Sequence, residues 1–269
     1  MSTAPIAFIG GGNMASALIG GLVKAGRAPA DILVIEPLDA QREKLAQAFG
    51  VMPLSGVNPA LAAAGTIVWA VKPQQFAEAA QACQGLLGHA LQVSVMAGVR
   101  GDALVQASGS PRVVRAMPNT PALIGRGIAG LHARPEVDAA ARAEVERLFA
   151  PTGESLWVDE EDQLDAVTAV SGSGPAYFFY VLEAMTEAAV QMGLSAGQGR
   201  RLAQSTMAGA AALAQASPLS AAELRAQVTS KGGTTHAAIT TLEAHGVGPA
   251  FVAALQAACR RAEELGRGG

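Results

Sequence analysis

The residues of this chain best suited to bind a small anionic ligand form the run Gly232-Gly233-Thr234-Thr235. Paired glycines within alanine-rich helical sequence cost about 1 kcal/mol each relative to alanine, so the pair needs a physical reason. A helix beginning at Thr234 supplies one, because its first backbone N–H groups have no partner within the helix and can bind an anion. Glycine lets a ligand approach the backbone, and the threonines add hydroxyl groups. Capping of its own helix is the alternative role for Thr235.

A second candidate anion site lies near the start of the chain, in the run Ile9-Gly10-Gly11-Gly12-Asn13-Met14-Ala15. The spacing Gly10-x-Gly12-x-x-Ala15 follows a predicted strand and opens a predicted helix, as the dinucleotide fingerprint requires. Gly10 permits the tight turn, Gly12 lets the pyrophosphate approach the backbone, and Ala15 allows close packing of helix on strand. A glycine-rich turn without a ligand is the structural alternative.

The second predicted strand ends at Glu36, about 20 residues after the fingerprint, where a carboxylate can accept hydrogen bonds from the ribose of NADH. The same charge disfavours the 2′-phosphate of NADPH, although Arg42 could compensate. The choice between NADH and NADPH therefore stays open, and Glu36 favours NADH. The third predicted strand closes with Val71-Lys72-Pro73, where Lys72 either faces the cofactor or is solvated, and Ala97-Gly98 after the fourth would let a flat ring approach the backbone.

The elements that must position these residues divide the chain at about residue 160. Short apolar runs before it predict strands at residues 6–9, 32–36, 66–71, 91–96, 113–117, 127–132 and 155–158. Helical patterns lie at residues 14–25, 39–49, 74–86, 101–107 and 136–150. Alternation of strands with crossover helices predicts an α/β domain with a parallel sheet over residues 1–160.

From residue 161 to residue 269 no strand pattern is present. Helices are predicted at residues 163–170, 176–192, 196–216, 221–228, 234–244 and 249–265, with a break at residues 171–175 between the first two. Helices so rich in alanine have little bulk for a core of their own, so we expect this all-α domain to associate with a second copy.

Composition excludes several classes of function. Hydrophobic residues make up 50% of the 269 residues and charged residues 15%, which describes a globular chain rather than a disordered one. The net charge of −3 and the 4% of aromatic residues disfavour nucleic acid as a partner. The four histidines and two cysteines show no metal-ligand spacing, so no metal is expected. Neither a signal peptide nor a membrane span is apparent, which predicts a cytoplasmic protein.

Five blocks of the sequence together resemble pyrroline-5-carboxylate reductases over nearly the whole chain. The blocks are Phe8-Ile9-Gly10-Gly11-Gly12-Asn13-Met14, Ala70-Val71-Lys72-Pro73-Gln74, Arg115-Ala116-Met117-Pro118-Asn119-Thr120-Pro121, Val170-Ser171-Gly172-Ser173-Gly174-Pro175-Ala176-Tyr177 and Gly232-Gly233-Thr234-Thr235. The first block is common among Rossmann-type enzymes, whereas the last three in this order are specific to the family.

The resemblance implies an N-terminal Rossmann-type domain, a C-terminal helical dimerisation domain, and reduction of 1-pyrroline-5-carboxylate to L-proline with NADPH or NADH. It implies a homodimer or a ring of dimers in which the helical half of one subunit completes the site of another. It places the substrate on Gly232, Gly233, Thr234 and Thr235, with the Thr235 hydroxyl on the ring nitrogen as the catalytic contact. It places the cofactor on Ile9, Gly10, Gly11, Gly12, Asn13, Met14, Glu36, Asn58, Ala70, Val71, Lys72, Pro73, Ala97 and Gly98.

Two residues depart from the family pattern. Lys231 stands where the family usually has proline, and it either helps to capture the substrate carboxylate or points to solvent. Glu36 stands where a hydroxyl or basic residue is frequent, which puts a preference for NADPH in doubt.

Two other functions fit parts of the pattern. β-Hydroxyacid dehydrogenases have a similar two-part layout, but they resemble G-x-G-x-x-x-K at the start of the inter-domain helix, and this chain has Phe178 at the lysine position. A dinucleotide sensor without catalysis would use the helical half for association alone, and it would have no need of a second anion site at Gly232–Thr235.

Overall fold

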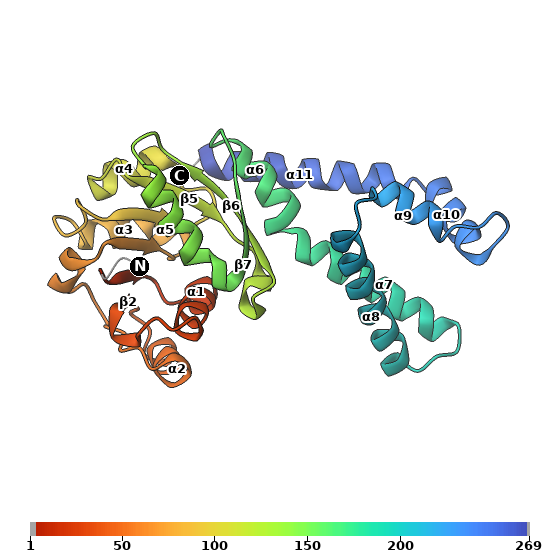
Figure 1. Cartoon of the computed structure of the whole chain (residues 1–269), viewed down its shortest axis with the longest axis horizontal. Helices are drawn as coiled ribbons and strands as arrows, with labels where there is room; N and C mark the ends of the chain where they lie inside the picture. The colour runs from red at the N-terminus through yellow and green to blue at the C-terminus, as the bar shows by residue number, and fades with distance from the viewer. Residues whose placement is uncertain (1–3, 268–269) are drawn as a thin grey trace. The chain divides into compact units, whose positions relative to one another are not determined.

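The computed structural model describes residues 4–267 and contains one seven-stranded sheet in its N-terminal part (Figure 1). The strands lie side by side in the order β2-β1-β3-β4-β5-β6-β7. Their bounds are β1 Ile6–Ile9, β2 Ile32–Ile35, β3 Thr66–Trp69, β4 Leu91–Ser94, β5 Val113–Met117, β6 Gly127–Ala133 and β7 Gly153–Trp157. All seven predicted strands are present, and the α/β class is confirmed.

Strands β1 to β5 are parallel, as predicted, whereas β6 pairs antiparallel with β5 and parallel with β7. The prediction of a parallel sheet is therefore wrong for β6 and β7. The reason is the connection between β5 and β6, residues 118–126, which holds only the 3₁₀ turn η4 (Thr120–Ile124). A parallel crossover needs a dozen or more residues and usually a helix, so this segment reverses the chain direction.

Helices cover both faces of the sheet. They are α1 Asn13–Lys24, α2 Asp39–Phe49, α3 Phe76–Ala82, α4 Gly101–Ser108 and α5 Ala139–Phe149. Alternate residues of β1 face opposite sides: Phe8 packs with α1 and α5, and Ile9 packs with α3 and α4. The predicted helix at 74–86 is shorter in the structure, because Pro73 begins a separate 3₁₀ turn, η3 (Pro73–Gln75).

The remaining helices are α6 Gln163–Val167, α7 Gly174–Gln191, α8 Ala196–Ala216, α9 Ala221–Gln227, α10 Thr234–Ala244 and α11 Val247–Arg267. The break predicted at residues 171–175 is largely a π-helical turn, η6 (Thr168–Gly172), which leads directly into α7. Within residues 4–267 no single helix is long and apolar enough to cross a membrane; α10 and α11 reach that length and composition only as a pair bent by 54°.

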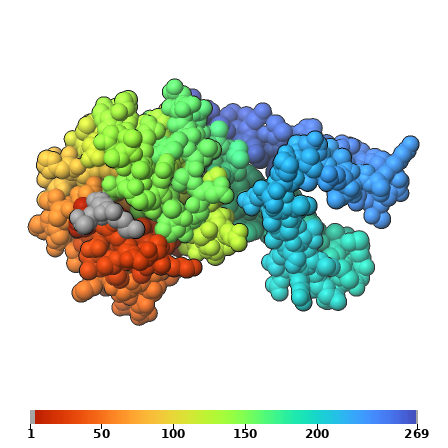
Figure 2. All heavy atoms as spheres, in the orientation of Figure 1, coloured from red at the N-terminus to blue at the C-terminus, as the bar shows by residue number. Residues whose placement is uncertain are grey.

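The chain divides into two compact units that differ from the predicted division at residue 160. The first unit holds residues 4–173 and 258–267, and the second is Gly174–Ala257. In the second unit, only Gly174, Ala189, Gly199 and Ala203 are buried. Its helices lie in the teal and blue part of the chain in the space-filling view (Figure 2). This unit has no apolar core of ordinary size.

Candidate functional site

The glycine turn after β1 lies where the order of the parallel strands reverses, between β1 and β3. Gly10 has φ +97°, and its N–H donates to the Ile35 carbonyl at 2.8 Å. A Cβ on Gly10 would lie 2.6 Å from the Ala70 carbonyl oxygen, so a side chain is excluded by both conformation and space. The fold thus brings two predicted cofactor segments, residues 9–14 and 70–73, together at the edge where open α/β sheets bind ligands.

The start of α1 is open to an anion. Gly12 is the N-cap, no side chain caps the helix, and its first turn has no acidic residue. A Cβ at Gly12 would meet nothing within 4 Å. By contrast, side chains cap α5, α8 and α9 through Asp138, Ser195 and Ser220. Free N–H groups at Asn13 and Met14 beside open space above Gly12 fit the pyrophosphate of a dinucleotide.

Glu36 directly follows β2, and its N–H donates to the Leu54 carbonyl. Its carboxylate is held on both oxygens: Oε2 accepts from the Gly11 N–H at 2.8 Å and Oε1 from the Leu38 N–H at 2.9 Å. The Gly11 carbonyl in turn accepts from the side chain of Gln41. Side chains after β2 therefore fix the glycine turn after β1, a role that the fingerprint alone does not reveal.

The other predicted cofactor residues lie on loops after β2, β3 and β4. Asn58 accepts from the Ala60 N–H at 2.9 Å and caps the short 3₁₀ turn η2 (Pro59–Ala63). Lys72 is exposed and immediately precedes η3. Ala97 is exposed, whereas a Cβ on Gly98 would lie 3.2 Å from the Leu265 carbonyl oxygen. Gly98 thus has a structural reason to be glycine, namely close contact with the end of α11.

The run of residues 230–235 is described within the second unit. Gly232 has φ +77°, which returns the chain so that Gly233 becomes the N-cap of α10. No side chain caps this helix and its first turn has no acidic residue, so the capping alternative for Thr235 is not what the structure contains. Thr235 is half-buried, and Lys231 is exposed. The start of α10 thus resembles the start of α1.

Two features that the sequence reasoning did not assign support this edge of the first unit. Asn119 accepts from the Ile128 N–H at 3.0 Å and donates to the Ser171 carbonyl at 3.2 Å, which joins the β5–β6 connection to η6. Buried Arg115 pairs with Glu161 at 2.8 Å, and Glu161 also accepts from the Gly101 N–H at 2.7 Å. Asn119 and Ser171 are 52 positions apart and Arg115 and Glu161 are 46 apart, so no local sequence pattern predicts these two contacts.

Electrostatics at Glu161 follow from these contacts. Burial pushes the pKa of this carboxyl up, but the hydrogen bonds from the Gly101 N–H and from Arg115, with the charges of Arg115 and Arg100, hold the pKa below its ordinary value. Arg100 itself pairs with Asp162 and, at 3.8 Å, with Asp165. The network connects α4, β5 and α6 within the first unit.

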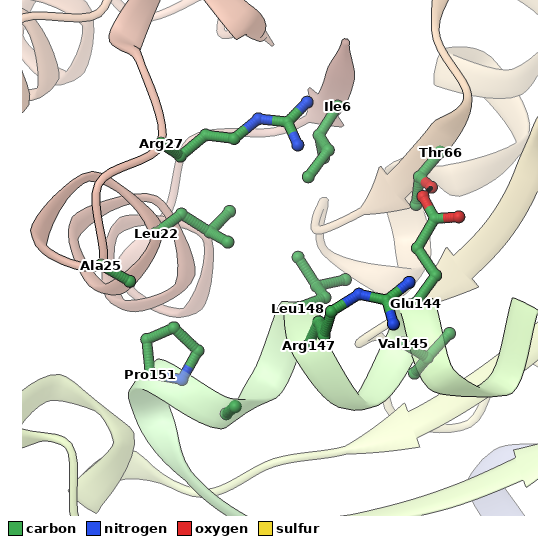
Figure 3. Close-up of a pocket in the computed structure, with 11 residues that line it drawn as sticks. Ile6, Leu22, Ala25, Arg27, Thr66, Glu144, Val145, Arg147, Leu148 and Pro151 are labelled. Carbon is green, nitrogen blue, oxygen red and sulfur yellow. Dashed lines mark hydrogen bonds between the residues drawn. The ribbon is translucent and has the colours of Figure 1, made fainter. Parts of the chain in front are cut away.

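A cavity of about 220 Å³ lies elsewhere in the first unit, between α1 and α5 (Figure 3). It opens beside the amino ends of β1 and β3, where Ile6 and Thr66 line it. The Thr66 hydroxyl donates to Glu144 at 2.6 Å at its edge. None of the predicted cofactor or substrate residues lines it. The cavity is therefore at the opposite ends of these strands from the glycine turn.

Within residues 4–267, no group of three or more His, Cys, Asp and Glu side chains is arranged to hold a metal ion. The two cysteines are free, Cys83 buried and Cys259 half-buried. Burial is the main reason that the pKa of each thiol is raised.

Family models match both halves of the chain. Residues 161–265 match the model for pyrroline-5-carboxylate reductase dimerisation, and residues 5–98 match the model for NADP oxidoreductase, coenzyme F420-dependent. The chain is 46% identical over 267 residues to a pyrroline-5-carboxylate reductase of Pseudomonas aeruginosa, with 98% of each chain covered.

Solved structures match over the same extent. A pyrroline-5-carboxylate reductase of Coxiella burnetii is similar with a TM-score of 0.91 and 37% identity, over 98% of this chain and 99% of that one. The pyrroline carboxylate reductase of Plasmodium falciparum, solved with NADP bound, has a TM-score of 0.87 and 26% identity, over 99% of both chains.

Proposed function

The chain belongs to the pyrroline-5-carboxylate reductase family, and we propose that it reduces 1-pyrroline-5-carboxylate to L-proline with NADH or NADPH, the last step of proline biosynthesis. The ring carbon of the C=N bond gains a hydride, the nitrogen gains a proton, and the reduced dinucleotide becomes oxidised. One observation carries the proposal: α1 and α10 each have a glycine as N-cap, with neither a side-chain cap nor an acidic first turn. Two such sites suit a reductase of an anionic substrate, one for the dinucleotide and one for the carboxylate.

The first unit binds the dinucleotide in this account. Gly12, Asn13 and Met14 receive the pyrophosphate at the start of α1, and Glu36 faces the adenosine ribose. The remaining cofactor residues are those named from the sequence: Ile9, Gly10, Gly11, Asn58, Ala70, Val71, Lys72, Pro73, Ala97 and Gly98. The reduced nicotinamide ring supplies the hydride when the dinucleotide is bound. Asn119 and the Arg115–Glu161 pair are positioning residues, because they hold the loops at this edge.

The second unit binds the substrate. Gly232, Gly233 and Thr234 present backbone N–H groups at the start of α10, which favours the substrate carboxylate. The Thr235 hydroxyl bonds the ring nitrogen and so orients the C=N bond. A protonated cyclic imine is already an electrophile, so alignment of the ring contributes more than a strong acid or base. The exposed side chain of Lys231 points to solvent in this account.

Association completes the enzyme. The family model that matches residues 161–265 describes dimerisation, and the second unit exposes large apolar side chains that a partner subunit would cover. They include Phe178, Phe179 and Tyr180 on α7. We infer a homodimer or a ring of dimers in which the helical unit of one subunit contributes to the site of another. A cytoplasmic location, with neither nucleic acid nor membrane as partner, stays a prediction from the sequence.

The test is spectrophotometric, because reduced nicotinamide absorbs near 340 nm. NADH and NADPH oxidation is followed separately with pyrroline-5-carboxylate, with no imine, and with the 3-oxo or semialdehyde form of a 3-hydroxy acid. The proposal predicts oxidation with the cyclic imine alone. Turnover of the 3-hydroxy-acid couple without turnover of the imine would instead indicate a β-hydroxyacid dehydrogenase, and binding without oxidation would indicate a sensor.

A further inference from the structure

We propose that Glu36 makes this chain select NADH over NADPH, through a carboxylate that the fold fixes in place beside the ribose. The inference rests on the proposed function only in taking the end of β2 as the ribose side of the dinucleotide site. It goes beyond the family match, because the matched model and the Plasmodium falciparum structure both concern NADP.

The Glu36 carboxylate is held in one orientation by its hydrogen bonds. Glu36 is 6% exposed, and its two oxygens accept from N–H groups on two different loops, that of Gly11 after β1 and that of Leu38 before α2. Rotation of the side chain toward solvent would break both bonds and leave the Gly11 and Leu38 N–H groups without this acceptor. An incoming ligand therefore meets a negative charge at a fixed position.

The fixed negative charge of Glu36 has opposite effects on the binding of NADH and NADPH. In this fold, the acidic residue after the second strand accepts hydrogen bonds from the ribose 2′-hydroxyl. Its oxygens have lone pairs beyond those that the two N–H groups use, so a ribose of NADH gains an acceptor. A 2′-phosphate carries about −1.5 to −2 charges at neutral pH and would meet the like charge of Glu36.

The guanidinium group of Arg42 already interacts with other groups of the protein. Its Nη1 donates to the carbonyls of Glu36 at 2.8 Å and Pro37 at 2.7 Å, and its other terminal nitrogen pairs with Asp39. To reach a 2′-phosphate, this guanidinium would have to give up those acceptors. Asp39, the first residue of α2, also adds a negative charge next to this loop. The local structure thus opposes the possibility that Arg42 compensates for the charge of Glu36 and binds the 2′-phosphate of NADPH.

Binding of ligand fragments to the full-length protein tests the inference without any imine present. Calorimetric titration measures the affinity of each protein for ADP-ribose and for its 2′-phosphorylated form. The ratio of these two affinities is compared among the wild type, Glu36→Gln and Glu36→Ser. The glutamine variant keeps the size of the side chain but removes the charge. Glu43→Ser is the matched control, because Glu43 is an exposed carboxylate on the neighbouring α2. Thermal melts confirm that the variants are folded.

The expected result is that the wild type and Glu43→Ser bind ADP-ribose at least tenfold more tightly than the 2′-phosphorylated form. Both Glu36 variants should reduce that ratio at least tenfold. Equal binding by the wild type, a preference for the 2′-phosphate, or an unchanged ratio in folded Glu36→Gln overturns the inference. These outcomes are separate from those of the imine assay: selectivity without imine reduction would refute the proposed function and leave the inference standing.

Discussion

The backbone N–H of Gly11 donates to Oε2 of Glu36 at 2.8 Å, and this bond joins the turn after β1 to the end of β2. The two residues are 25 positions apart, and both are among the residues proposed to bind the dinucleotide. The glycine turn is thus held from outside as well as by its own conformation. Variants of this region should therefore separate effects on coenzyme binding from effects on folding.

Gly10→Ala should abolish tight coenzyme binding and destabilise the fold. The positive φ of Gly10 costs an L-residue about 1–2 kcal/mol, and the new Cβ would also lie 2.6 Å from the Ala70 carbonyl oxygen. Gly26→Ala is the matched control, because Gly26 has φ +96° with nothing within 4 Å of a Cβ. Both variants should lose stability in denaturant titrations, but only Gly10→Ala should weaken NADH binding at least tenfold. Equal coenzyme affinity in the two variants would contradict the close-approach argument.

Thr235→Ala should lower kcat/KM for the imine at least tenfold and leave the coenzyme dissociation constant within about twofold, since one lost hydrogen bond to a charged group is worth about 1.5–3 kcal/mol. Thr241→Ala on the same helix is the control: the Thr241 hydroxyl bonds the Ala237 carbonyl within α10, and its removal should leave kinetics unchanged. Steady-state kinetics and fluorescence titration of NADH provide the two readouts. Wild-type kinetics in Thr235→Ala would refute the role assigned to its hydroxyl.

Glu161 should make stability depend on pH at the acid end. Its folded-state pKa is lowered, so its contribution to stability is fully present above the unfolded value, about 4.3 for a Glu side chain, and is lost as the pH falls through the folded value. Chemical denaturation between pH 3 and 7 should show a shallower pH dependence in Glu161→Gln than in the wild type. An identical slope in the two proteins would show that this carboxyl does not contribute.

Arg115→Met should cost about 1–3 kcal/mol of stability, because it leaves the Glu161 carboxylate without its buried charged donor. Arg126→Met is the comparison, since the side chain of Arg126 is exposed. That variant should change the free energy of unfolding by less than about 0.5 kcal/mol. Similar losses in both variants would indicate that charge in general, rather than this pair, stabilises the unit.

Phe179→Asp should dissociate the oligomer and lower activity, because it places a charge on the exposed apolar surface of α7. Gln81→Asp on α3 adds the same charge at an exposed polar position of the first unit and should leave the assembly intact. Light scattering with size-exclusion chromatography measures the mass of each. A Phe179→Asp protein of unchanged mass would show that this side chain lies outside the interface.

The sequence predicted most of the fold because its signals are local. Apolar runs located every strand, and the spacing of Gly10, Gly12 and Ala15 located the glycine turn between β1 and α1. The antiparallel direction of β6 was not predicted, because an apolar run has the same pattern in a parallel and in an antiparallel strand. Only the short connection of residues 118–126 indicates that the chain reverses between β5 and β6. The hydrogen bonds of Glu36 with the Gly11 and Leu38 N–H groups could not be predicted from the sequence. A glutamate at the end of a strand gives the same sequence pattern whether its carboxylate contacts a ligand or the backbone. The roles of individual site residues stay predictions.

The proposed reduction of pyrroline-5-carboxylate to L-proline is tested by comparing the coenzyme consumed with the L-proline formed in one reaction. The purified enzyme is supplied with pyrroline-5-carboxylate and NADH; absorbance gives the NADH oxidised, and chromatography of the amino acids gives the proline produced. The predicted result is one L-proline formed for each NADH oxidised. Without the imine, neither NADH oxidation nor L-proline formation is expected. Oxidation of NADH without proline, or no oxidation of NADH or NADPH with the imine present, would contradict the account.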